Sequence, residues 1–329
     1  MKLDSVRELK MTLTPAVAES AASFAAVRSF GVAARSSARP AHPRTFALGI
    51  APQKKKGDFA LAVRIQNRAF EGSLEVERLK KRAKGEIDIR YIGRVAKRVP
   101  WNQKIVRPLQ IGLSAGHFQI TAGTLGAFVR AGAGNAVLIL SNNHVLANEN
   151  AAANGDAILQ PGDFDHGRNP QDKIAVLTKF IALVPGASNT VDCAVATVTG
   201  IAVNLNKIRG LGKLAGLRPN GLLPGDHVAK LGRTTGLTKG RVTAIELDNV
   251  VITYDIGDLR FDDQIEIEGA GTKPFSQGGD SGSLIVDASR HGAALLFAGG
   301  DQGGSNGQGL TYGNPIQAVL AALGVQLLF

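Results

Sequence analysis

The most informative part of the sequence is a glycine-rich turn, Gly278-Gly279-Asp280-Ser281-Gly282-Ser283-Leu284, which carries a serine just ahead of an apolar stretch. A serine hydroxyl is a weak nucleophile until a neighbouring base removes its proton. The glycines allow the backbone to turn so that the N–H groups of Gly279 and Ser281 point at one spot. Such a pair of donors forms an oxyanion hole, in which loss of one donor costs about 10²–10³ in rate. The turn therefore predicts a nucleophilic serine with its own anion-stabilising site.

Two further motifs supply the partners that a serine nucleophile needs. The string Ser141-Asn142-Asn143-His144-Val145 directly follows one apolar stretch, and Asp192 opens another. Taken alone, each of these polar residues would be an ordinary turn residue. Taken in the order histidine, aspartate, serine, they predict a catalytic triad in which His144 is the base, Asp192 orients its ring and Ser281 attacks.

The pattern of apolar residues after about position 110 predicts many short strands. Apolar stretches recur about every ten residues, and each is bounded by Gly, Asn, Asp or Pro, as in all-β domains. The first group is expected at residues 118–121, 127–130, 137–140, 157–159, 174–180 and 194–198. The second group is expected at residues 228–231, 242–246, 250–254, 264–267, 283–286 and 294–298. Two such groups indicate two β-barrels in series, with a closing helix over Pro315–Leu323.

The first hundred residues have a different character. They hold 21 Lys and Arg against 9 Asp and Glu, whereas the remaining residues hold 17 against 18. We expect a basic α+β domain over residues 1–100, a linker over 101–109 and the double barrel over 110–329. In the basic domain an amphipathic helix over 12–40 leads a strand (45–50), a strand (59–65), a helix (74–84) and a strand (86–90).

This charge asymmetry has two interpretations. The basic residues either form a solvated face that keeps the protein soluble, or bind an acidic partner and regulate the neutral part. No aromatic residues are interleaved with the charges, which disfavours a site for single-stranded nucleic acid.

Composition excludes several other classes of protein. Hydrophobic residues make up 44% of the 329 residues, which is enough for a large core. No apolar stretch approaches the ~18–20 residues that cross a membrane, so no integral membrane association is expected. The single Cys193 excludes a disulfide framework and a cysteine zinc site, and indicates a reducing, cytoplasmic location. The composition of residues 12–40 also suits a transit peptide, so organelle import stays open. No metal or cofactor is expected.

These motifs resemble a known family. The string Gly279–Ser283 resembles the serine motif of chymotrypsin/trypsin-like proteases, especially the glutamyl-endopeptidase and HtrA-like branches, and Ser141–Val145 resembles their histidine motif. The strings at residues 122–126, 140–148, 159–162 and 231–238 resemble intracellular trypsin-like proteases related to the plant narrow-leaf protein and its bacterial homologues. The resemblance covers residues 44–329. It implies a mainly β, chymotrypsin-like double β-barrel, serine endopeptidase activity through an acyl-enzyme, protein or peptide substrates, and assembly into trimers or larger oligomers.

The resemblance also suggests where a substrate side chain would bind. Phe275, six residues before Ser281, is expected at the floor of the pocket, and Ala298, Gly299 and Gly300 are expected in its wall. A pocket of this kind favours small or apolar side chains, although Asp301 beside the wall could reverse that preference.

Asp280 raises a separate question about activation. In the resembled family this aspartate pairs with an N-terminal ammonium that is released by cleavage. Here more than a hundred residues precede the first barrel. Either another cation pairs with Asp280, or cleavage near the linker activates the enzyme, and the sequence leaves both alternatives open.

Overall fold

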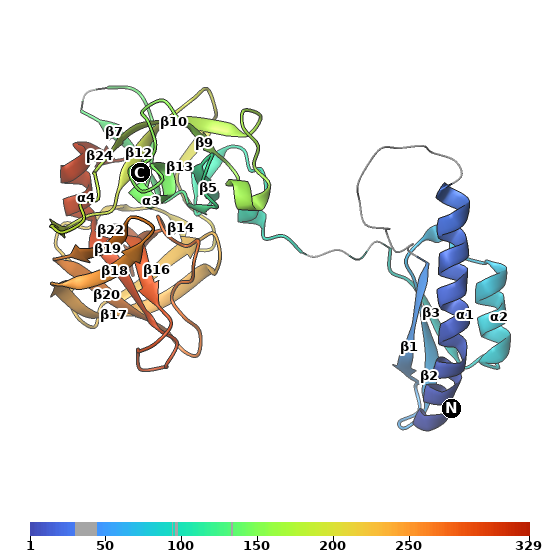
Figure 1. Ribbon diagram of the computed structural model, residues 1–329. Coiled ribbons are helices and arrows are strands. Elements are labelled where there is room, and N and C mark those ends of the chain that lie inside the picture. The colour runs from blue at the N-terminus through green and yellow to red at the C-terminus, as the bar shows by residue number, and fades with distance from the viewer. Residues whose placement is uncertain (30–44, 94, 96–97, 133) are drawn as a thin grey trace. The chain divides into compact units, whose positions relative to one another are not determined.

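The computed structural model describes residues 1–29, 45–93, 95, 98–132 and 134–329. The chain divides into two compact units, Met1–Arg98 and Val99–Phe329 (Figure 1). Among the described residues, no helix has the length and apolar character needed to cross a lipid bilayer.

The first unit is a small α+β structure. Its sheet runs in the order β1 (Phe46–Pro52), β2 (Phe59–Ile65) and β3 (Ile87–Tyr91), with an antiparallel first pair and a parallel second pair. Helices α1 (Leu3–Ser29) and α2 (Leu74–Arg82) cover one face of this sheet (Figure 1). The expected leading helix thus begins earlier, at Leu3, and the part of it expected beyond residue 29 lies outside the described residues.

The second unit contains two large sheets, as predicted. The strands of the first barrel are β5 (Ser114–His117), β6 (Gly123–Thr124), β7 (Ala127–Ala131), β8 (Leu138–Ser141), β9 (Ala157–Leu159), β10 (Lys173–Phe180), β12 (Ala194–Val198) and β24 (Val325–Leu327). They pair in the order β24-β7-β8-β12-β10-β9-β5-β6.

The second barrel is a closed ring of strands. Its members are β15 (Gly216–Leu217), β16 (His227–Gly232), β17 (Gly236–Leu247), β20 (Gln264–Gly269), β21 (Leu284–Asp287), β22 (His291–Gly300) and β23 (Leu310–Pro315). They pair in the order β15-β22-β21-β16-β17-β20-β23, and β22 also pairs with β23. This last pairing closes a ring from β22 to β23, and β15 is attached to β22 outside the ring. The predicted fold class, a mainly β, chymotrypsin-like double β-barrel preceded by a small α+β part, is confirmed.

Two small sheets and a closing helix lie beside the large sheets of the second unit. One sheet has the order β11 (Ser188–Asn189), β19 (Gly257–Phe261) and β18 (Val250–Tyr254), and the other has the order β14 (Gly212–Lys213), β13 (Val203–Ile208) and β4 (Leu109–Ile111). The predicted closing helix is α4 (Ile316–Leu323), which ends at Gly324 with a left-handed φ of 70°. A shared apolar core includes Phe128 and Leu140 of the first barrel and Leu231 and Leu284 of the second.

Residues 118–121 and 101–109 of the second unit differ from the sequence prediction. The expected strand at residues 118–121 is a turn, and the strand β5 lies just before it. The expected linker at residues 101–109 is packed on the second unit, because the side chain of Asn102 is buried. Its Nδ2 donates to the carbonyl oxygens of Gly112 (3.1 Å) and Gly232 (2.9 Å).

Candidate active site

Strand pairing explains why His144 and Asp192 meet. His144 lies in the short helix α3 (Asn143–Leu146), directly after strand β8, and Asp192 lies two residues before strand β12. The two strands are antiparallel neighbours, and Ala194 is paired with Ser141. The end of β8 and the start of β12 therefore lie side by side, although almost fifty residues separate them in the chain.

The contact between His144 and Asp192 is a direct hydrogen bond. Nδ1 of His144 lies 2.5 Å from Oδ2 of the fully buried Asp192, and the N–H groups of Asn143 (2.6 Å) and His144 (3.4 Å) donate to Oδ1. Burial lowers the pKa of His144, but the charge and hydrogen bond of Asp192, helped by Glu149, outweigh it and raise that pKa above its ordinary value. Because Nδ1 is occupied by Asp192, Nε2 is the nitrogen left for proton transfer.

Ser281 lies in the second barrel, in the turn before strand β21. The N–H groups of Asp280 and Gly282 donate to the carbonyl oxygens of Gln277 (3.0 Å) and Leu296 (2.8 Å). In the described part of the chain, the N–H groups of Gly279 and Ser281 have no acceptor within hydrogen-bonding distance. These are the two donors that the sequence predicted for an oxyanion hole, and they are available to an incoming oxygen atom.

Thr124 of the first barrel holds this turn in place. Its Oγ1 donates to the carbonyl oxygen of Gly279 (3.0 Å), and its N–H donates to that of Ser281 (2.8 Å). Gly279 has a left-handed φ of 90°, a conformation that an L-residue rarely adopts. A Cβ at this position would also lie 2.7 Å from Oγ1 of Thr234. Glycine is therefore required where the sequence places it.

A cavity of about 300 Å³ brings the predicted residues together. His144 and Ser281 both line it, with Tyr254 on the same wall. Among the described residues no hydrogen bond joins His144 to Ser281. Catalytic hydrogen bonds of this kind are often long before a substrate binds.

Of the expected pocket residues, three line the cavity and one does not. Ala298, Gly299 and Gly300 line the cavity as expected. Phe275 does not, because its ring is fully buried in the core of the second barrel, against Gly240. The neighbouring Ser276 lines the cavity instead, with its Oγ 2.7 Å from Oγ1 of Thr311 in β23. The expected place of Phe275 in the pocket is therefore not met, and its chain neighbour Ser276 lines the cavity.

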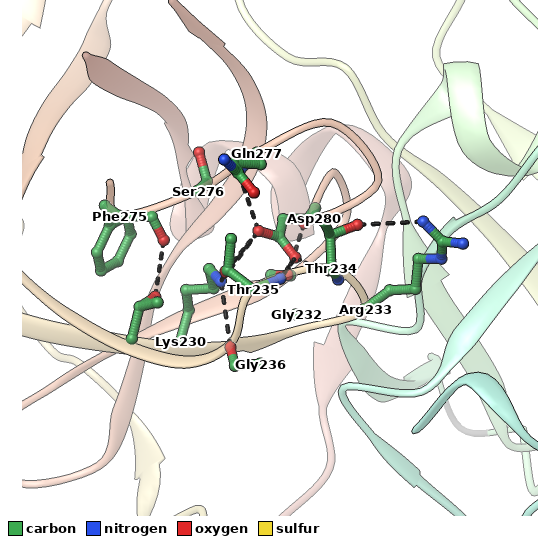
Figure 2. Close-up of polar contacts among 12 residues, drawn as sticks. Lys230, Gly232, Arg233, Thr234, Thr235, Gly236, Phe275, Ser276, Gln277 and Asp280 are labelled. Carbon is green, nitrogen blue, oxygen red and sulfur yellow. Dashed lines mark hydrogen bonds and ion pairs between the residues drawn. The ribbon is translucent and has the colours of Figure 1, made fainter. Parts of the chain in front are cut away.

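Asp280 is fully buried and pairs with an internal cation. Nζ of the equally buried Lys230, in strand β16, lies 3.2 Å from Oδ2 of Asp280. The N–H groups of Thr234 (2.8 Å) and Thr235 (3.1 Å) donate to Oδ1, and the N–H of Gln277 (3.0 Å) donates to Oδ2. Figure 2 shows how these groups surround the carboxylate. Of the two alternatives that the sequence left open, the structure has another cation paired with Asp280.

Three residues of the site, Lys230, Thr124 and Tyr254, were not predicted from the sequence. Lys230 had a detectable signal, because it interrupts an otherwise apolar strand at an inward position, where a charge needs a buried partner. Thr124 and Tyr254 had none, since their contacts depend on segments more than sixty residues away.

Comparisons with known proteins give fold-level matches. No protein-family model matches the sequence, and no curated protein matches it. Among solved structures, Thermobifida fusca Protease A matches with 18% identity and a TM-score of 0.46, over 66% of this chain and 97% of that chain. Cellulomonas bogoriensis chymotrypsin matches with 20% identity and a TM-score of 0.45, over 67% and 99%. A glutamic acid specific serine protease matches with 20% identity and a TM-score of 0.47, over 67% and 100%.

Proposed function

We propose that the protein is a serine endopeptidase that hydrolyses peptide bonds through an acyl-enzyme. Ser281 Oγ attacks the carbonyl carbon of the substrate while Nε2 of His144 takes the hydroxyl proton. The N–H groups of Gly279 and Ser281 stabilise the negative oxygen of the tetrahedral intermediate. The C–N bond then breaks, and His144 returns the proton to the leaving amine. A water molecule hydrolyses the resulting ester by the same route, which restores Ser281 and His144.

One observation carries this proposal. His144, hydrogen-bonded to a buried carboxylate, lines the same cavity as a serine whose turn leaves two amide donors free. The alternative is a binding protein built on this fold, since a fold alone does not establish activity. A binding protein would have no need of an oriented base and free amide donors beside one serine.

The test is labelling with a fluorophosphonate probe, followed by intact mass measurement. We expect one adduct on the wild type and none on Ser281→Ala. The matched control is Ser276→Ala, because Ser276 presents another hydroxyl to the same cavity and is expected to leave the single adduct intact. An unlabelled wild type, or an adduct that persists in Ser281→Ala, would contradict the proposal.

The basic first unit supports a second role, the binding of an acidic partner that regulates the enzyme. On and after helix α2, the basic residues Arg78, Lys81, Arg82 and Lys84 are exposed, and none has an ion-pair partner among the described residues. Retention of the whole protein on a polyanion column, as salt is raised, tests this role. Binding that depends on these charges must weaken steeply with salt, and retention that ignores ionic strength would contradict it.

The family resemblance supports assembly into a trimer or larger oligomer. The single Cys193 supports a location in the cytoplasm. Sedimentation equilibrium tests the first expectation, and a monomeric mass would contradict it. Fractionation of cells tests the second, and recovery in an organelle would contradict it.

A further inference from the structure

The buried carboxylate of Asp192 has a second side-chain partner besides His144. The hydroxyl of Tyr254 donates to Oδ2 of Asp192 at 2.8 Å, the same oxygen that lies 2.5 Å from Nδ1 of His144. The rings of His144 and Tyr254 also meet edge to face, with centroids 5.8 Å apart and an interplanar angle of 73°. Tyr254 therefore contacts both members of the pair.

One small sheet brings Tyr254 to this place. Tyr254 is the last residue of β18, which is antiparallel to β19, and β19 is parallel to β11. Asp192 follows the end of β11 by three residues. The strand that precedes Asp192 and the strand that carries Tyr254 thus lie on either side of β19 in one sheet. The stacked pair Tyr254 and Phe261 anchors the tyrosine ring to β19 (centroids 6.0 Å).

The hydrogen bond from Tyr254 completes the coordination of the carboxylate. An ionised carboxylate offers about four lone-pair sites. Oδ1 of Asp192 accepts from the N–H groups of Asn143 and His144, and Oδ2 accepts from His144 Nδ1 and Tyr254. A fully buried carboxylate with every site in use has one favourable orientation.

Tyr254 remains a donor throughout the working pH range. Burial, followed by the charge of Asp192, its hydrogen bond and the charge of Glu149, raises the pKa of Tyr254 far above its ordinary value. The phenol is therefore protonated whenever His144 titrates. The other charged groups on this cavity are Glu149 and Asp301.

We propose that Tyr254 is a positioning residue for His144, because its hydroxyl fixes the orientation of Asp192 and withdraws part of the carboxylate charge from the imidazole. The catalytic part of this inference rests on the proposed endopeptidase function. The electrostatic part does not, since it concerns only the three side chains. With the phenol present, Asp192 stabilises the imidazolium less than a carboxylate without this donor would.

The variant Tyr254→Phe tests the inference, because it removes the hydroxyl and keeps the ring. We expect the pKa of His144 to rise and the rate of fluorophosphonate labelling to fall about tenfold at a pH where His144 is neutral, which corresponds to about 1.4 kcal/mol. The pKa is measured by NMR titration of protein labelled with ¹⁵N-histidine, with the His144 signal assigned from its loss in His144→Gln.

The matched control is Tyr312→Phe. Tyr312 packs in the same aromatic cluster, and its hydroxyl lies 3.4 Å from a carboxylate oxygen of Glu266, away from Asp192. We expect this variant to leave both the pKa of His144 and the labelling rate unchanged. A merely structural role of Tyr254 would slow labelling without moving the pKa.

A second measurement keeps the test decisive if Tyr254→Phe does not fold. Replacement of tyrosine by 3-fluorotyrosine makes the phenol a stronger donor, so the pKa of His144 should fall rather than rise. The same replacement in the Tyr312→Phe variant assigns the effect to Tyr254. In that variant the other tyrosine is Tyr91, which lies in the first unit.

The outcomes separate the two proposals. Suppose that the wild type is labelled but the pKa of His144 moves neither in Tyr254→Phe nor with 3-fluorotyrosine. This result overturns the role of Tyr254 and leaves the endopeptidase proposal intact. An unlabelled wild type in which the pKa of His144 moves as expected overturns the endopeptidase and upholds the electrostatic coupling.

Discussion

Two buried aspartates of the second unit, Asp192 and Asp280, are alike in burial and differ in the partners that surround them. Neither side chain is exposed, and both carboxylate oxygens of each accept hydrogen bonds. Asp280 faces an ammonium group, Lys230, together with backbone amides. Asp192 also accepts from backbone amides, but its side-chain partners are an imidazole and a phenol.

The difference shows how one residue type can fill two roles. An ammonium partner gives a fixed charge pair, which suits a residue that holds the turn of Ser281 in shape. An imidazole partner titrates near neutral pH, which suits a residue that must support a proton transfer. The nature of the partner, rather than the burial of the carboxylate, separates a structural site from a reactive one.

The largest effect is expected from Asp192→Asn. An amide at this position can present an N–H group to Nδ1 of His144, which puts the ring proton on Nε2, where the base is needed. In triads of this kind the change costs about 10⁴ in kcat. Peptide hydrolysis, or the rate of probe labelling where no substrate is known, gives the measurement. A rate within tenfold of the wild type would show that Asp192 does not orient the base.

The next largest effect is expected from Lys230→Met, and it concerns stability. The variant leaves the buried charge of Asp280 without a counter-ion, which typically costs about 3–5 kcal/mol of folding free energy. Urea unfolding gives the measurement. The matched control is Arg241→Met, which breaks the pair with Glu268 from a side chain that is 54% exposed, and should cost about 0–1 kcal/mol.

A double variant sharpens this prediction. Asp280→Asn in the Lys230→Met background removes the stranded charge, so part of the lost stability should return. If Lys230→Met is as stable as Arg241→Met, the burial of the Asp280 charge does not depend on Lys230.

The smallest effect concerns the pH dependence of activity. Because Asp192 and Glu149 raise the pKa of His144 above 6.5, the acid limb of kcat/KM should have its midpoint above that value. His144 must be neutral to act as a base, so activity is lost as the pH falls through this pKa. Glu149→Gln removes one of the charges that raise the pKa and should move the midpoint down. A midpoint that moves up would contradict this assignment.

The contribution of the His144–Asp192 pair to folding stability changes with pH in the opposite direction to activity. A raised pKa in the folded state means that protonated His144 stabilises the fold. This contribution is complete below the unfolded pKa and is lost as the pH rises through the folded pKa. Comparison of unfolding free energies of wild type and His144→Gln across this range checks it, and a difference that grows with pH would contradict it.

Local sequence signals were sufficient for the fold class, and they pointed to His144, Asp192 and Ser281 as candidate site residues. The strands at residues 127–130, 157–159, 194–198 and 250–254 were predicted within one residue of their observed bounds, because turn-forming residues delimit each apolar stretch. His144 directly follows one predicted strand and Ser281 directly precedes another, and each lies in a distinctive sequence motif. Both residues line one cavity, which the motifs alone could not place.

The errors fall where tertiary contacts decide. Strand β13 was not predicted, since Asn204 and Asn206 interrupt its apolar pattern and its pairing with β4 is distant in the chain. Phe275 was placed by counting back from Ser281, but the side chain of this large apolar residue is buried and the cavity wall passes to Ser276. The contact of Tyr254 with Asp192 depends on where the β18–β19 hairpin packs, and the local sequence does not predict that position.

Strand β24 has a consequence for how the molecule is made. It is the last strand in chain order, yet it pairs with β7 (Figure 1). The same sheet contains β8 and β12, the strands next to His144 and Asp192. During synthesis from the N-terminus, β7 emerges from the ribosome about two hundred residues before its partner, so its edge stays unpaired while the intervening residues are made. The first barrel is therefore completed only after every strand of the second barrel has been synthesised, and His144 reaches its finished surroundings no earlier than that.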